Sequence, residues 1–199
     1  MKILVIGVTG TIGGAVATAL ADRHEVIGVH RKSEPAVDVE KPATIEALFA
    51  EVRELDAVVC CAGNAVFKPL AELEDKDLDF CLHSKLVGQV MVIRHALKHI
   101  RDGGSITVTS GTLAQHPMVG AAAISMVNAG LEGFVRGAAL EAPRGIRVNV
   151  VSPGWVTETL VAMKMDPSHG MPAAEVAKAY VASVEGKLTG QTIDPSRRP

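Results

Sequence analysis

Short apolar runs recur along the chain, and each one ends in small residues and leads into a stretch with helical periodicity. Alternation of this kind needs crossover connections, which place parallel strands in one sheet and helices on both of its faces. Strands are predicted at residues 3–6, 25–29, 38–39, 57–61, 105–109, 146–151 and 191–193. Helices are predicted at about residues 12–21, 44–53, 75–100, 125–141 and 173–185. The predicted fold class is therefore α/β, a doubly wound parallel sheet of about seven strands with helices on both faces.

The composition fits one packed domain that spans residues 1–199. Apolar residues make up 48% of the chain and charged residues 21%, and because aromatic residues reach only 3%, the core must be aliphatic. A net charge of −2 argues against nucleic acid or an anionic membrane surface as a partner. No run approaches the ~20 apolar residues of a membrane helix. Cys60, Cys61 and Cys81 are too few for a disulfide framework, so we expect reduced thiols and a cytoplasmic location.

The ends of four predicted strands carry the candidate site. Gly7, Gly63, Ser110 and the pair Pro153-Gly154 each follow directly on an apolar strand. In an open parallel sheet, ligands bind beyond the carboxyl ends of the strands. We therefore expect these residues to converge on one edge of the sheet and to form the site there.

A glycine-rich turn lies between the first predicted strand and the first predicted helix. Glycines let the backbone turn tightly and approach a diphosphate, while the helix N-terminus offers unpaired N–H groups. The alternative is a plain strand-to-helix turn, but a strand before it and a helix after it favour a dinucleotide site. The chain is thus predicted to be a single NAD(P)-binding domain of the Rossmann type. Its first cofactor-binding candidates are Gly7, Thr9, Gly10, Thr11, Ile12 and Gly13.

Basic residues stand at the tip of the second predicted strand. Dinucleotide folds that prefer NAD usually carry an acid there, which binds the ribose 2′-hydroxyl. This chain has His30, Arg31 and Lys32 instead, and a guanidinium pairs well with a 2′-phosphate. The pattern predicts NADP(H) in preference to NAD(H), with a solvated surface turn as the alternative.

Taken together, these motifs resemble the short-chain dehydrogenase/reductase family over nearly the whole chain. The resemblance includes Cys61-Ala62-Gly63 after the fourth strand, Ser110 at the family's active-site serine, and the helical segment 128–134. It implies an NADP(H)-dependent oxidoreductase that acts on a small carbonyl or alcohol, and a homodimer or homotetramer. It also implies further cofactor-binding residues, which are Asp38, Val39, Cys61, Ala62, Gly63, Pro153, Gly154, Val156 and Thr157.

The chain departs from the family pattern at the catalytic pair. Ile124 and Asn128 stand where the family has its tyrosine and lysine, and Lys85 stands where the family has an asparagine on the long helix. Lysine and asparagine thus exchange helices. The one tyrosine of the chain, Tyr180, lies in the last predicted helix, where the strand order gives no reason to expect it in the site.

Two functions remain open at this point. If the chain is an enzyme, the catalytic candidates are Ser110, Lys85 and Asn128. Lys85 would hold the nicotinamide ribose or serve as an acid, and the alternative is a lysine on a solvated helix face. His83 and His116 are further possible proton donors. If the chemistry is lost, the chain is a catalytically silent NADP(H)-binding protein that acts as a sensor or a partner-binding module. No metal site is predicted, and the substrate is not predicted.

Overall fold

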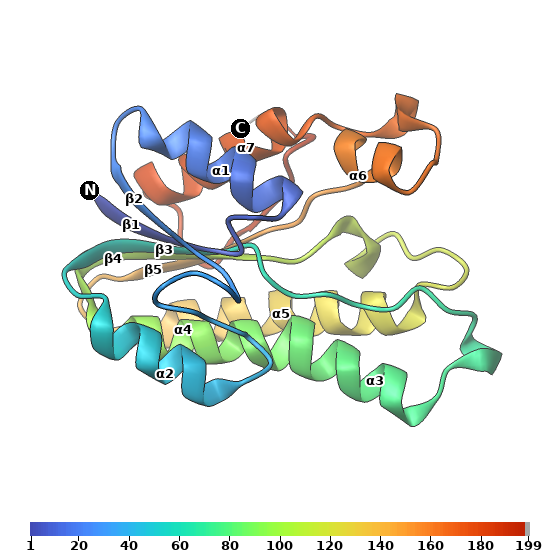
Figure 1. Ribbon diagram of the computed structural model, residues 1–199, viewed down its shortest axis with the longest axis horizontal. Coiled ribbons are helices and arrows are strands. Elements are labelled where there is room, and N and C mark those ends of the chain that lie inside the picture. Colours follow the sequence, from blue (N-terminus) through green and yellow to red (C-terminus); the bar gives the residue numbers. More distant parts are fainter. Residues whose placement is uncertain (198–199) are drawn as a thin grey trace.

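The computed structural model describes residues 1–197, in which a central parallel sheet lies between two layers of helices (Figure 1). Within these residues the sheet has six strands in the order β2-β1-β3-β4-β5-β6, and every neighbouring pair is parallel. The strands are β1 Lys2–Ile6, β2 Glu25–Val29, β3 Leu55–Cys60, β4 Ile100–Thr109, β5 Arg147–Val151 and β6 Thr192–Ile193. The predicted fold class is confirmed.

The predicted strand at residues 38–39 is wrong, so the described sheet has six strands and not seven. Residues 30–41 run as turns and irregular chain. The physical reason lies at Asp38, because the Thr44 hydroxyl accepts from its N–H at 3.0 Å and donates to its carbonyl at 2.8 Å. Both main-chain groups are therefore satisfied without a neighbouring strand.

Helices cover both faces of the sheet. Helices α1 and α7 lie on one face, and α2, α4 and α5 lie on the other (Figure 1). The bounds are α1 Thr11–Ala21, α2 Pro42–Glu51, α3 Asp75–Cys81, α4 Gly88–His99, α5 Ala122–Glu141, α6 Thr157–Ala162 and α7 Ala173–Glu185. Short 3₁₀ turns are η1 Leu70–Glu72, η3 Thr112–Ala114 and η4 Pro167–His169.

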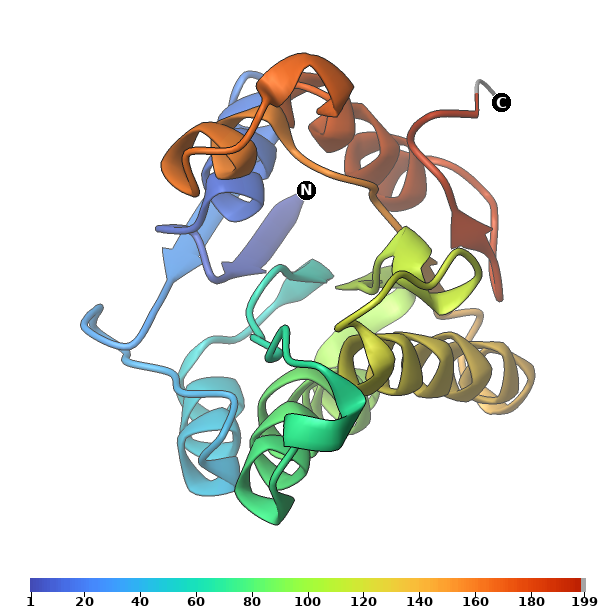
Figure 2. The ribbon, with the colours of Figure 1, turned by 90° about the vertical axis from the view of Figure 1, so that its right-hand side faces the viewer.

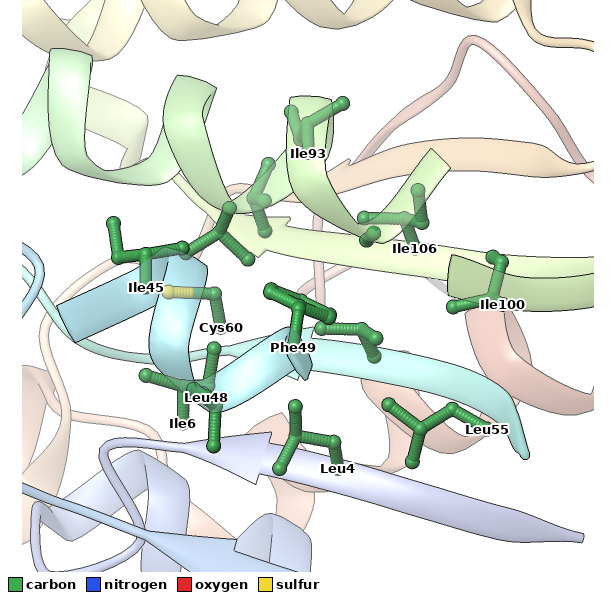
Figure 3. Packing of buried hydrophobic residues seen from close by; sticks show 14 of the residues in the cluster. Leu4, Ile6, Ile45, Leu48, Phe49, Leu55, Cys60, Ile93, Ile100 and Ile106 are labelled. Atoms are coloured by element: carbon green, nitrogen blue, oxygen red, sulfur yellow. The ribbon is translucent and has the colours of Figure 1, made fainter. Parts of the chain in front are cut away.

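Side chains on the two faces of the sheet pack into two separate hydrophobic cores. On β1, Leu4 and Ile6 point towards α2, α4 and α5, and Ile3 and Val5 point towards α1 and α7. Figure 3 shows the first core, where Phe49 of α2 packs among aliphatic side chains from the strands. Full burial of each such side chain contributes roughly 1.5–3 kcal/mol, so the alternation of side chains along the strands sets which helices cover which face.

The long helix predicted at residues 75–100 is present, but it is interrupted. Between α3 and α4 the segment η2, Leu82–Val87, is a π-helix, a wider turn that occurs often at functional sites. The wider turn brings the helix backbone against the loop after β3. A Cβ on Gly63 would lie 3.0 Å from the Ser84 carbonyl oxygen, and Ser84 Oγ accepts from the Asn64 N–H at 3.1 Å. The segment therefore presents Ser84 and Lys85 at the carboxyl end of the sheet.

The strand order reverses between β1 and β3. The chain passes from β1 to β2 in one direction along the sheet, and the strands from β3 onward continue in the other. A crevice forms at such a switch point, beyond the carboxyl ends of the two strands. Figure 2 looks onto this edge, where the connections after β3, β4 and β5 face the viewer.

Candidate functional site

A cleft of about 430 Å³ lies at the switch point. Ten of the predicted cofactor-binding residues line it: Gly7, Thr9, Gly10, Arg31, Lys32, Asp38, Val39, Cys61, Ala62 and Gly63. Sequence reasoning did not assign the other lining residues to the cofactor; they are Ile6, His30, Val37, Glu40, Asn64 and Ser84. The signal in the sequence that could have identified them is that each adjoins a predicted site residue along the chain.

The glycine turn leaves the N-terminus of α1 open to the cleft. Gly7 has a φ of +89°, and a Cβ there would lie 2.9 Å from the Ala62 nitrogen on the neighbouring loop. A Cβ on Gly13 would overlap the carbonyl oxygen of Gly7. Gly10 is the N-cap and no side chain caps the helix, so the first-turn N–H groups, among them those of Thr11 and Ile12, are available to an anion.

Arg31 and Lys32 lie at the mouth of the cleft. Both side chains are exposed, and neither forms an ion pair with another residue in 1–197. Asp38, deeper in the cleft, has its carboxylate 3.6 Å from the Lys41 ammonium. The outer end of the cleft therefore carries two cations that are free to meet a negatively charged ligand.

The three catalytic candidates come together at the end of β4. The Lys85 ammonium donates to the Ser110 carbonyl oxygen at 3.4 Å, and the Asn128 side-chain N–H donates to the Gly111 carbonyl oxygen at 3.3 Å. Lys85 reaches this place from η2, and Asn128 reaches it from α5 on the other side. The two helices that the sequence singles out thus approach one residue, Ser110.

Burial controls the charge of Lys85. It lowers the pKa of the ammonium from its ordinary value of 10.5 to about 8. Burial also raises the pKa of the Cys60 and Cys61 thiols to about 12, so they are neutral near pH 7 and give the ammonium no counter-charge. A lysine that gives up its proton this readily suits proton transfer near neutral pH.

Glu132 is a site residue that sequence reasoning missed. It lies one turn after Asn128 on α5 and is only 3% exposed. Ser110 Oγ donates to its carboxylate at 2.7 Å and Ser152 Oγ at 3.1 Å, and the Gln115 amide donates to the other oxygen. The signal that could have found it is an acid four residues after Asn128, on the same buried helix face.

Neither Ile124, at the position of the family's tyrosine, nor Tyr180 presents an acidic group to the site. Ile124 is 7% exposed on the buried face of α5, and it has no ionisable group. Tyr180 is fully buried and donates to Thr109 Oγ1 at 2.8 Å, since the Thr109 hydroxyl itself donates to the Cys60 carbonyl. Burial raises the pKa of Tyr180 well above its ordinary value, so it remains a neutral packing residue beneath the sheet edge.

The remaining cofactor-binding candidates lie between the end of β5 and the first residue of α6. The Pro153 carbonyl accepts from the Thr112 N–H at 3.0 Å, and the Thr157 N–H donates to the Met171 carbonyl at 2.9 Å. Pro153, Gly154, Val156 and Thr157 do not line the cleft described above. Next to them Trp155 stacks on Phe67, with ring centres 5.6 Å apart. His83 and His116 are exposed.

No helix in residues 1–197 combines the length and the apolar character needed to cross a membrane. Over the same residues, no group of three or more histidine, cysteine, aspartate or glutamate side chains is arranged to hold a metal ion.

Comparisons with known proteins show which family the chain is similar to. A family model described as enoyl-(acyl carrier protein) reductase matches residues 7–185. The hydroxynaphthalene reductase-like protein Arp2 of Metarhizium brunneum is 30% identical, over 90% of this chain and 79% of its own. The crystal structure of the protein lin1944 from Listeria innocua has a TM-score of 0.93 at 36% identity and covers 98% of both chains.

A second solved structure shares the fold. It is a small-chain dehydrogenase in complex with NADPH, with a TM-score of 0.86 at 24% identity, and it covers 98% of this chain and 95% of its own. The family model spans most of the sequence. The chain therefore belongs to the short-chain dehydrogenase/reductase family of oxidoreductases.

Proposed function

We propose that the chain is an NADP(H)-dependent oxidoreductase that interconverts a small carbonyl compound and its alcohol. The observation that carries the proposal is the cleft at the switch point, into which an uncapped helix N-terminus opens. A substrate site next to the three residues that meet at Ser110 would complete the reaction centre.

The residues of the cleft fit a dinucleotide. Gly7 and Gly13 keep the turn free of side-chain atoms, and any Cβ there would collide with the neighbouring backbone. The first-turn amides of α1 would hold the diphosphate, Asp38 and Val39 would face the adenine end, and Cys61-Ala62-Gly63 would line the wall opposite the glycine turn. The bound nicotinamide would supply or accept the hydride.

The preference for NADP(H) rests on Arg31 and Lys32. A 2′-phosphate at the outer end of the cleft would gain charge-assisted hydrogen bonds, and these contribute about 1.5–3 kcal/mol each. NADH lacks that phosphate and would gain nothing. The NADPH complex of a protein with the same fold supports the choice.

A side-by-side titration tests this part. We expect the wild type to bind NADPH at least tenfold more tightly than NADH, and Arg31→Ala to weaken NADPH binding by roughly 10- to 100-fold. Binding of NADH should stay unchanged in that variant. Arg53→Ala, which removes an exposed arginine two residues after α2, is the matched control. Tighter binding of NADH than of NADPH to the wild type would refute the preference.

Lys85 is the proposed proton donor and ribose ligand. Its ammonium lies beside Ser110, and its pKa of about 8 matches the transfer of a proton to a developing alkoxide near neutral pH. Asn128 would hold the Ser110–Gly111 backbone from the other helix. Under this proposal Ile124 contributes shape and no proton.

The second candidate function is that of a catalytically silent NADP(H)-binding protein. Asn128 and Ile124 provide no acid on α5 at the positions of the family's catalytic pair, which suits a protein that binds NADP(H) and has lost the chemistry. The two functions separate in one assay, in which NADPH binding is measured first and NADPH oxidation is then followed with a panel of carbonyl compounds. Tight binding without hydride transfer to any compound would select the silent binding protein.

We also propose that the chain forms a homodimer or homotetramer through its long helices. The outer face of α5 exposes Met126, Phe134 and Leu140, with 44%, 37% and 89% of their surface accessible. Apolar surface of this kind is commonly covered in an assembly. Light scattering should give a mass of two or four chains, and a monomer at micromolar concentration would contradict the proposal.

A further inference from the structure

Ser110 is held by two charged side chains that belong to different helices. On one side the Lys85 ammonium donates to its main-chain carbonyl at 3.4 Å. On the other side the Ser110 hydroxyl donates to the Glu132 carboxylate at 2.7 Å. The hydroxyl hydrogen of Ser110 is therefore used in a hydrogen bond to a residue of α5.

The hydrogen bonds around Glu132 indicate an ionised carboxylate. Both oxygens accept, one from Ser110 and Ser152 and the other from Gln115. No lysine, arginine or histidine in residues 1–197 forms an ion pair with Glu132. A carboxylate that is 97% buried is stable only if hydrogen bonds replace its lost water, and these three donors provide them.

The alternative acceptor for the Ser110 hydrogen is weak. The Asn128 carbonyl oxygen lies 3.4 Å from Ser110 Oγ, which is much longer than the contact with Glu132, and hydrogen bonds to ionised groups are the stronger ones. A hydroxyl group has one hydrogen to donate and two lone pairs to accept with. Within the described residues no group donates to Ser110 Oγ, so its free capacity is that of an acceptor.

We propose that Glu132 is a positioning residue that turns Ser110 into a hydrogen-bond acceptor, and that the site thereby prefers an alcohol over the matching carbonyl compound. An alcohol donates its hydroxyl hydrogen to Ser110 Oγ and accepts from the Lys85 ammonium. A carbonyl oxygen can only accept a hydrogen bond, so it would face a lone pair of Ser110 Oγ and form no hydrogen bond with it. This proposal rests on the proposed function, because it specifies the substrate of the same site. It assigns to Ser110 the opposite polarity to a donor that polarises a carbonyl.

The variant Glu132→Gln reverses the arrangement. The oxygen of the new amide would face Gln115, and its NH₂ group would donate towards Ser110 and Ser152. The Ser110 hydrogen would then be free to point into the site. We expect KM for an alcohol to rise roughly 3- to 10-fold and KM for its ketone to fall by a similar factor. Ser110→Ala, which leaves Glu132 two of its donors, should abolish the difference between the two ligands.

The probes are matched pairs at saturating cofactor: 2-propanol with acetone, cyclohexanol with cyclohexanone, and benzyl alcohol with benzaldehyde. Glu141→Gln removes an exposed carboxylate at the end of the same helix and serves as the control, with no change expected in either KM. An unchanged ratio of alcohol to ketone KM in both Glu132→Gln and Ser110→Ala would overturn the proposal.

A readout that needs no turnover completes the test. The infrared difference spectrum between the wild type and Glu132→Gln should contain the bands of an ionised carboxylate, and the band of a protonated carboxyl in its place would overturn the proposal whatever the ligands do. NADPH titration of the wild type is run in parallel. A wild type that ignores NADPH defeats the proposed function, while the infrared spectrum still decides the state of Glu132, so the two failures are distinct.

Discussion

Replacing the Lys85 ammonium with an uncharged side chain of the same length should stabilise the fold. Burial lowers the pKa of Lys85 from 10.5 to about 8, and at about 1.36 kcal/mol per pKa unit the cost of keeping the charge below pH 8 is on the order of 3 kcal/mol. The side chain is partly exposed, which reduces that figure. We expect Lys85→Met to be more stable than the wild type by about 1–3 kcal/mol at pH 7.

The pH dependence of this gain has a defined sign. Between pH 8 and pH 10.5 the unfolded chain binds more protons at position 85 than the folded chain, so the stability of the wild type rises with pH through that window. The advantage of Lys85→Met should therefore be full below pH 8 and vanish near pH 10.5. Cys60 and Cys61, whose pKa values are raised to about 12, oppose the trend in both proteins and largely cancel in the difference.

The assay is urea unfolding of the two proteins across pH 7 to 10.5, compared at equal m-values. Lys98→Met removes an exposed lysine near the end of α4 and should change the stability by no more than about 0.5 kcal/mol. The same Lys85→Met protein should lose hydride transfer under the proposed function. A Lys85→Met protein that is less stable than the wild type at pH 7, or a gain that does not shrink with pH, would show that the buried ammonium does not destabilise the fold.

Three further changes should have separable effects. Gly13→Ala places a methyl group on the Gly7 carbonyl oxygen, so it should cost about 1–3 kcal/mol and weaken NADPH binding; calorimetry that finds unchanged affinity would contradict the role of the turn. Tyr180→Phe removes the hydrogen bond to Thr109 and should cost about 0.5–1.5 kcal/mol in urea unfolding, with kcat retained; loss of kcat in a folded variant would assign Tyr180 to the chemistry. Trp155→Ala removes the ring stacked on Phe67, and it should raise KM for apolar substrates while the Kd for NADPH stays constant; an altered Kd would place the pair at the cofactor.

The fold was predictable from sequence because the strands are long enough to show their pattern. Apolar residues make up most of β1, β3 and β5, and every residue of each strand except one is buried, as is typical of parallel strands covered on both faces. Residues 38–39 were predicted as one more short strand, and the contacts of the Asp38 main chain with Thr44 show otherwise. Side-chain bonds to the backbone of this kind depend on tertiary placement.

The π-helical interruption of the long helix could not be predicted from the periodicity of its apolar residues. The stripe of Leu82, Leu86 and Val90 continues through η2 with ordinary helical spacing. The π-helical turn forms where the loop at Gly63 and Asn64 presses against Ser84. These contacts join residues some twenty positions apart, so a local pattern carries no trace of them.

The candidate site was predicted in part for the same reasons. Strand ends and glycines mark the cleft, because the topology brings strand ends together whatever the side chains are. Lys85 and Ser110 were selected by their positions, and the structure places them in contact. Glu132 was missed because a charged residue on a helix normally faces water, and its burial is compensated by hydrogen bonds from Ser110, Ser152 and Gln115, which the sequence pattern does not reveal.

Binding of the dinucleotide at the glycine turn can be seen directly in a crystal structure of the protein with NADPH. We expect the diphosphate within hydrogen-bond distance of the first-turn amides of α1, Thr11 to Gly13, and the 2′-phosphate against Arg31. Saturating NADPH that leaves the cleft empty, or a diphosphate that makes no contact with the start of α1, would contradict it.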